Sequence, residues 1–140
     1  MELLVKEYLK THSLAELEAE HGVKARWNTR EDKFSLNYDQ IKVTPGDPLA
    51  EQCRGLILRP LSILIKDDGR EMPVGDVDVL AWPLNRFYNL GEHTAAPVDW
   101  SDPELRIFEK LDGTMCILYW DEKHDQWHVA TRSVPEADLP

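Results

Sequence analysis

From about residue 23 onward, short apolar stretches alternate with turn-forming residues, and this pattern limits the fold more than any other feature. The last two stretches predict a hairpin, because only the polar residues 121–126 separate them. Turn signals also lie at 45–48, at 67–69 and between Gly91 and Pro103. Many short strands with turn-rich connections favour a mostly antiparallel sheet. The expected strands are 23–27, 33–38, 54–58, 61–65, 77–82, 114–120 and 127–132.

The residues before position 23 predict two short helices. Apolar residues recur at helical spacing within residues 3–10. Ser13 begins a second helix, because Glu16 follows three residues later and completes a capping box. Gly22 suits the end of that helix. Together with the strands, these helices predict an α+β fold, and 140 residues correspond to one domain.

Charge and composition exclude several classes of protein. The net charge of −10 argues against a general coat protein for nucleic acid, because phosphates are bound mainly by Lys and Arg. No apolar run approaches the roughly 18 to 20 residues that cross a bilayer, so we expect no membrane partner. The two cysteines, Cys53 and Cys116, do not suggest a disulfide framework, and both are expected to be small core residues. We therefore expect a cytoplasmic, reducing compartment.

Lys110 is the first candidate for chemistry. It lies in 109–113, Glu-Lys-Leu-Asp-Gly, ahead of the strand expected at 114–120. A primary amine at a tight turn can attack phosphorus or a carbonyl once it loses its proton. The alternative is an ordinary solvated lysine before an Asp-Gly turn, and the tetrad alone does not decide between the two.

Two upstream segments could supply partners for that amine. In 51–58, Arg54 precedes an apolar strand, where its guanidinium could bind phosphate or carboxylate. In 85–92, Arg86 stands next to Phe87 and Tyr88, a combination that suits a base stacked near phosphates. Each segment has a plainer interpretation, namely a surface arginine in the first and core aromatic side chains in the second.

The five histidines show no metal-binding spacing, so we expect no protein metal ligands. His124 and His128 are four residues apart, but they flank an expected turn and would not share a helical face. We interpret them as surface or incidental residues.

Taken in order, three motifs resemble the N-terminal half of phage-type ATP-dependent RNA ligases of the T4 RNA ligase 1 type. They are Glu-Gln-Cys-Arg-Gly-Leu-Ile-Leu at 51–58, Asn-Arg-Phe-Tyr-Asn-Leu-Gly-Glu at 85–92 and Glu-Lys-Leu-Asp-Gly-Thr-Met at 109–115. That family belongs to the covalent nucleotidyltransferases, with DNA ligases and capping enzymes. The resemblance implies that residues 1–140 form the N-terminal part of an adenylation domain with a curved antiparallel sheet.

The resemblance also implies a mechanism. Lys110 would attack the α-phosphate of ATP, with Mg²⁺ present, and hold AMP through a phosphoramide bond. The AMP would pass to an RNA 5′-phosphate, and a 3′-hydroxyl would then displace it. Nearby cations would favour the neutral amine and stabilise the phosphate oxygens. The residues that the resemblance assigns to nucleotide or RNA contacts, or to the loop around Lys110, are Arg54, Arg86, Phe87, Tyr88, Glu109, Asp112, Gly113 and Arg132.

The chain departs from the family at two places. The segment 131–133, Thr-Arg-Ser, lacks the glycine usual in the next motif, and only seven residues follow Ser133. The family's later carboxylate and its closing pair of lysines have no counterpart in those residues. Three interpretations stay open: a truncated RNA ligase domain, a nucleotide-binding remnant without catalysis, or another covalent nucleotidyltransferase such as a DNA ligase or capping-type enzyme.

Overall fold

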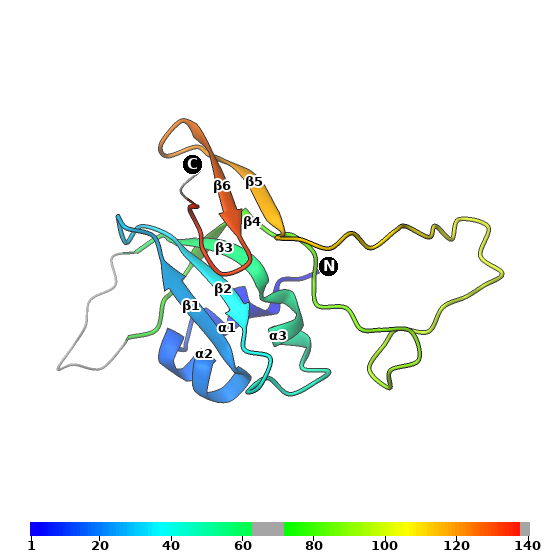
Figure 1. Cartoon of the computed structure of the whole chain (residues 1–140). Helices are drawn as coiled ribbons and strands as arrows, with labels where there is room; N and C mark the ends of the chain where they lie inside the picture. The colour runs from blue at the N-terminus through cyan, green and yellow to red at the C-terminus, as the bar shows by residue number, and fades with distance from the viewer. Residues whose placement is uncertain (63–71, 138–140) are drawn as a thin grey trace.

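The computed structural model describes residues 1–62 and 72–137 (Figure 1). The predicted α+β class with antiparallel sheets is confirmed. The elements, in chain order, are α1 (Leu4–Leu9), α2 (Leu14–His21), β1 (Val23–Trp27), β2 (Phe34–Tyr38), α3 (Pro48–Gln52), β3 (Arg54–Pro60), β4 (Val77–Ala81), β5 (Cys116–Asp121) and β6 (Gln126–Thr131).

The ends of α2 follow the predicted capping signals. The Ser13 hydroxyl accepts a hydrogen bond from the Glu16 amide at 3.1 Å, and the Ser13 amide donates to the Glu16 carboxylate at 2.7 Å. Gly22 ends the helix in the left-handed region, with φ of 64°. A Cβ atom there would lie 2.8 Å from the backbone nitrogen of Val43. Glycine therefore satisfies both the backbone conformation and the close approach of the following chain.

Two layers of structure cover the central four-stranded sheet, whose order is β1-β2-β3-β4. The three helices lie on one face, and the β5–β6 hairpin lies on the other (Figure 1). Alternate residues of β3 face the two layers: Leu56 and Leu58 join the core on the helix side, whereas Ile57 packs with the hairpin. Burial on both faces explains why β3 is a continuous apolar run.

The hairpin packs on the sheet through a small core of its own. Ile117, Tyr119 and Ala130 pack against Ile57. Along β5, exposed and buried residues alternate strictly, as expected for a strand with one face against the protein. Gly55 lies under the hairpin with φ of 86°, and a Cβ atom there would lie 2.8 Å from Ile117 Cδ1. The close contact between hairpin and sheet thus depends on glycine at this position.

The turn predicted at 45–48 is present at residues 45 and 46, where the Asp47 amide donates to the Thr44 carbonyl at 3.1 Å. A helix that the sequence did not predict begins directly after it. The Asp47 side chain accepts hydrogen bonds from the amides of Leu49 and Ala50 at 3.0 and 3.3 Å, and Pro48 occupies the first helical turn. These features begin α3, which has only five residues. Such a helix is too short to show a helical period in the sequence.

Two further expectations concern residues 61–69. Residues 61 and 62 lie in bends after β3 and not in the predicted strand 61–65. The remainder of that strand and the predicted turn at 67–69 lie outside the described residues.

The two cysteines differ in burial. Cys53 is fully buried, and burial raises the pKa of its thiol. Cys116 is exposed at the start of β5, so its predicted place in the core is wrong. It lies on the outward face of the hairpin, because side chains alternate along a strand. Both cysteines are free.

Residues 82–115 form a long loop without helix or strand, which projects from the body before it returns to β5 (Figure 1). The loop predicted between Gly91 and Pro103 lies within it. In the described part of the chain, no helix is long and apolar enough to cross a membrane.

Candidate functional site

The candidate site lies where four separate segments meet at the start of β3. Arg54 is the first residue of β3 and pairs with Asn37 of β2, next to an irregularity in the register. The neighbouring residue on β2, Tyr38, is buried. Arg86 comes from the long loop and Arg132 follows β6. The sequence motifs are thus brought together, although Arg54 and Arg132 stand far apart in the chain.

Aromatic rings hold these guanidinium groups. Arg86 lies between two rings, with its guanidinium carbon 4.8 Å from the centroid of Tyr38 and 4.8 Å from that of Tyr88. Arg132 lies 5.5 Å from the centroid of Tyr38. The guanidinium of Arg54 lies 5.1 Å from the ring centroid of Phe87. We call Arg54, Arg86 and Arg132 the arginine cluster.

The loop segment that carries Arg86 is fixed to the body by hydrogen bonds. The Arg86 amide donates to the Glu51 carbonyl at 2.7 Å. The Tyr88 hydroxyl donates to the Glu51 carboxylate at 2.8 Å and accepts from the Gly46 amide at 3.0 Å. Tyr88 therefore anchors this segment to α3 and supports Arg86 with its ring.

The arginine cluster has no internal counter-charge. Among the described residues, no carboxylate lies within ion-pair distance of Arg54, Arg86 or Arg132. The Nη1 atom of Arg86 is buried and has no hydrogen-bond partner. Guanidinium groups are forked donors suited to phosphate and carboxylate oxygens. Three such groups near one another have the donors that an anion with several oxygens requires.

Lys110 is not part of this cluster. Its side chain is 73% exposed, and the Nζ atom lies 3.6 Å from the carboxylate of Asp112, which is itself fully exposed. Glu109 is exposed as well, and Gly113 has φ of 141° with open space around it. The structure places no contact between Lys110 and the three arginines. It brings together the predicted phosphate contacts but leaves the predicted nucleophile in the loop.

The end of the loop nevertheless connects to the cluster. Arg54 Nη1 lies 3.1 Å from Met115 Sδ. Lys110 stands five residues before Met115, so an extended chain keeps it within roughly 18 Å of that contact. Lys110 is therefore tethered near the arginine cluster without touching it.

A second polar cluster holds the other end of the hairpin against the sheet. Asp121, at the end of β5, is fully buried and accepts hydrogen bonds from Lys33 Nζ and Arg59 Nη2, both at 2.7 Å. Burial acts to raise the pKa of Asp121, but the hydrogen bonds from Arg59 and Lys33 outweigh it and hold that pKa well below its usual range. Among the described residues, the ion-pair network comprises Asp32, Lys33, Arg59, Asp121 and Glu136, with Lys123, His124 and His128 at its border.

The interpretation of His124 and His128 as incidental is wrong. The His124 ring lies 2.6 Å from the Asp32 carboxylate. Burial acts to raise the pKa of Asp32, but hydrogen bonds from His124 and Asn28 and the charge of Arg59 keep it at about 2. His128 Nε2 lies 3.8 Å from Asp121 Oδ2, and its side chain is largely buried. Both histidines pack across the interface between hairpin and sheet.

Sequence reasoning also missed Tyr38 and Glu51 as parts of the site. Tyr38 ends an apolar strand, where a core tyrosine is the ordinary expectation. No local signal marks it as a surface for two arginines that lie 48 and 94 residues further along the chain. Glu51 acts partly through its backbone carbonyl, which any residue would supply.

Comparison with known proteins adds one distant relation. No family model and no solved structure matches the chain. A protein of Autographa californica nuclear polyhedrosis virus, named "Putative bifunctional polynucleotide kinase/RNA ligase", is 25% identical over 118 residues. The similarity covers 79% of this chain but only 15% of the viral protein, so the chain spans a small part of its relative's length.

Proposed function

We propose that this chain carries the adenylation part of an ATP-dependent RNA ligase of the T4 RNA ligase 1 type, with Lys110 as the nucleophile. The observation that carries the proposal is the arginine cluster: Arg86 and Arg132 lie over Tyr38 and Arg54 lies over Phe87, with no carboxylate within ion-pair distance among the described residues. The viral protein whose name includes RNA ligase supports the same assignment. The Lys-x-Asp-Gly tetrad leads directly into Met115, which contacts Arg54.

The proposed step forms a bond between Lys110 Nζ and the α-phosphorus of ATP. The bond from that phosphorus to the pyrophosphate oxygen breaks, and the amine loses its proton to water. Arg54, Arg86 and Arg132 would hold the phosphate oxygens and the departing pyrophosphate, because charge-assisted hydrogen bonds strengthen as negative charge develops. Lys110 would be the only residue of this set that becomes covalently modified.

The other predicted residues take supporting roles in the proposal. Phe87, about half exposed beside Arg54, offers a face for adenine. The Tyr88 hydroxyl is already engaged by Glu51 and Gly46, so we assign Tyr88 to the support of Arg86. Glu109, Asp112 and Gly113 would shape the loop around the lysine.

The ion in this proposal is brought by the nucleotide. Within residues 1–62 and 72–137, no group of three or more His, Cys, Asp and Glu side chains could hold a metal. Mg²⁺ commonly binds substrate phosphates and keeps several waters. When bound there, it would neutralise charge on the triphosphate. The adenylated lysine would then pass AMP to an RNA 5′-phosphate, and a 3′-hydroxyl would displace it.

Transfer of label from ATP to the protein tests the proposal. The chain is incubated with ATP labelled at the α-phosphorus and with Mg²⁺, and label on the denatured protein is measured. A phosphorus–nitrogen bond predicts label that resists alkali and is released by acid. Lys110→Ala should abolish it, whereas Lys42→Ala, which removes another exposed lysine, should leave it unchanged. Label that persists in Lys110→Ala would overturn the assignment of the nucleophile.

A second candidate is a nucleotide-binding module that performs no covalent step. The exposed position of Lys110, away from the three arginines, favours it. The two candidates differ in one result. The module would bind ATP with dependence on Arg86 and would carry no label, whereas the ligase domain would do both.

A further inference from the structure

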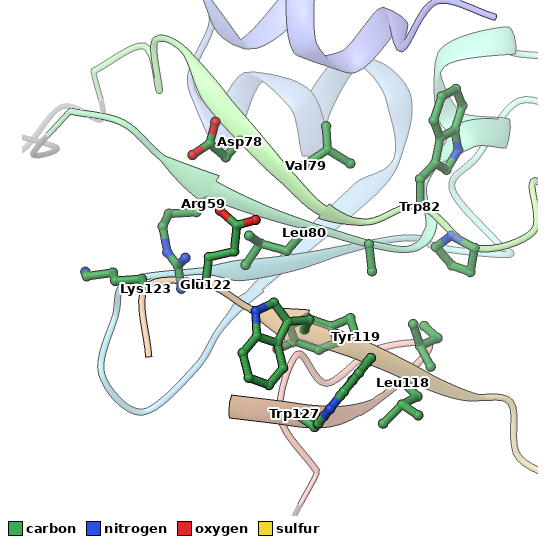
Figure 2. A pocket seen from close by; sticks show the side chains of 14 residues that line it. Arg59, Asp78, Val79, Leu80, Trp82, Leu118, Tyr119, Glu122, Lys123 and Trp127 are labelled. Carbon is green, nitrogen blue, oxygen red and sulfur yellow. The ribbon is translucent and has the colours of Figure 1, made fainter. Parts of the chain in front are cut away.

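A second surface of interest lies alongside β5, between the hairpin and the central sheet. It is a groove of about 1080 Å³ between β4 and β5 (Figure 2). Among the described residues, each of these strands is paired on one side only, β4 with β3 and β5 with β6. The groove therefore runs along two open strand edges. None of the residues assigned above to nucleotide contacts lines it.

Exposed tryptophan side chains form the middle of the groove. Trp127 is 63% exposed and Trp120 is 39% exposed, although both are large apolar side chains. Their ring centroids lie 5.4 Å apart with an angle of 67° between the planes. Because the two rings meet edge to face, a face of the more exposed ring, that of Trp127, stays open to solvent. Such a face can stack a nucleobase of any identity.

Positive groups lie at one end of the groove. Lys123 and Arg59 lie close to each other there, together with Glu122 (Figure 2). The Lys123 side chain is half exposed, with its nearest carboxylate, that of Asp32, at 3.5 Å. Arg59 is largely buried, and its Nε atom has no hydrogen-bond partner. An anionic group at this end would meet the exposed ammonium of Lys123, whereas the charge of Arg59 is already paired with the carboxylates of Asp121 and Asp32.

The other end of the groove leads toward the arginine cluster. Residue 116 begins β5 immediately after Met115, which contacts Arg54. Six residues of strand span about 20 Å. Cationic groups therefore lie at both ends of β5, and the two indole rings lie next to the end that carries Lys123. This order suits a flexible strand with phosphates at intervals and bases that stack.

We propose that the groove between β4 and β5 binds a single-stranded segment of RNA, with a base stacked on Trp127 and a phosphate beside Lys123. The choice of RNA as occupant rests on the proposed function. The groove is close to neutral overall, because Asp78 and Glu122 also line it. Stacking therefore contributes more to affinity than charge, and binding should depend only weakly on salt.

Binding of a short single-stranded RNA tests the proposal. The full 140-residue chain is titrated against an RNA with a 5′-phosphate and a 3′-fluorophore, and anisotropy is followed. Trp127→Ala should weaken binding by about 5- to 150-fold, the range for loss of one stacked base. Trp100→Ala is the matched control, because Trp100 is 66% exposed and lies in the long loop. Equal affinity of the two variants, or no binding by the unaltered chain, overturns the proposal.

A second variant tests the charged end. Lys123→Ala should lower the salt slope by about 0.7, the value for one phosphate contact to a single strand. Lys42→Ala, with a side chain that is exposed to nearly the same extent, should leave the slope unchanged. An unchanged salt slope in Lys123→Ala would show that no phosphate of the RNA binds beside Lys123.

Two further readouts separate this proposal from its rivals. If sedimentation shows a dimer that Trp127→Ala dissociates, the groove is an interface between copies and the RNA assignment is wrong. Label from ATP on Lys110, measured in Trp127→Ala, distinguishes a failure of the groove proposal from a failure of the proposed ligase function. Label that is retained while RNA affinity falls supports both. RNA binding that depends on Trp127 in a chain that takes up no label supports the groove alone.

Discussion

The hairpin is fastened to the sheet at two ends that differ in their charge balance. At the end of β5, the cations Lys33 and Arg59 meet the buried carboxylate of Asp121. At the start of β5, Arg54, Arg86 and Arg132 are held by aromatic rings, with no carboxylate within ion-pair distance among the described residues. Within the described residues, the cations of the ion-pair network meet carboxylates, whereas the guanidinium groups of the arginine cluster meet aromatic rings.

This difference indicates different tasks for the two ends. A buried ion pair that keeps all its partners holds two layers in one arrangement, and the loss of one partner is costly. Guanidinium groups stacked on rings retain donors for a ligand. We infer that the ion-pair network maintains the structure and that the arginine cluster is available for binding. The predictions below test this division.

The largest effect is expected from Asp121→Ala. This change leaves Lys33 and Arg59 buried without their shared carboxylate, and the loss of one partner of a buried ion pair costs about 3 to 5 kcal/mol. The free energy of unfolding in urea should fall by that amount. Asp112→Ala removes a fully exposed carboxylate and should change stability by less than about 0.5 kcal/mol. Similar stability for the two variants would contradict a structural role for the network.

Gly55→Ala should have the next largest effect, at the opposite end of the hairpin. The residue would keep φ of 86° with a Cβ 2.8 Å from Ile117 Cδ1 and 3.2 Å from the Cα of Arg132. Backbone strain of about 1 to 2 kcal/mol adds to the cost of overpacking. Stability should fall by at least about 2 kcal/mol in thermal or urea unfolding.

Gly91→Ala is the matched control for that change. Gly91 has nearly the same backbone angle, with φ of 87°, but no atom lies within 4 Å of the added Cβ. It should therefore show the backbone strain without the steric clash. An equal loss of stability in both variants would show that contact between hairpin and sheet does not matter at Gly55.

The sequence predicts those parts of this arrangement that depend on local signals. Ser13, Glu16 and Gly22 bound α2 because capping acts within one turn of the helix. The strand 23–27 and the final hairpin follow from alternation and turn residues. The class of fold could thus be predicted before any contact between layers was known.

Contacts across the layers could not be predicted in the same way. Lys33 and Asp121 are 88 residues apart, and neither belongs to a motif. In the sequence, His128 is an ordinary strand residue, because its contacts with Asp121 and Glu136 form only in the folded structure. The resemblance named Arg54, Arg86 and Arg132 because it covers several segments at once; the structure brings them to one end of the hairpin, and their role in binding stays a prediction. The resemblance did not predict that the loop with Lys110 projects away from the arginine cluster.

Binding of pyrophosphate or ATP tests the arginine cluster directly. Arg86→Gln removes a charged donor from the arginine cluster, and a hydrogen bond to a charged group contributes about 1.5 to 3 kcal/mol. Affinity in calorimetric titration should fall by roughly ten- to hundred-fold, while the free energy of unfolding changes little. Arg26→Gln removes an exposed arginine of β1 and should leave affinity unchanged. A large loss of stability in Arg86→Gln would make the arginine cluster a structural element like the ion-pair network.

The smallest expected effect is a loss of stability in mild acid, caused by His128 at the border of the ion-pair network. Burial and then the charge of Lys33 lower the pKa of His128 from its ordinary 6.5, despite the opposing carboxylates of Glu136 and Asp121. The unfolded chain therefore binds the proton more readily, and stability should decline as pH falls through 6.5. Asp32, with a pKa of about 2, adds to the loss only near pH 4 and below. His128→Gln should flatten the decline in melting temperature between pH 8 and pH 5, whereas variants of the arginine cluster should retain it. A decline that survives His128→Gln would assign the pH dependence to another group.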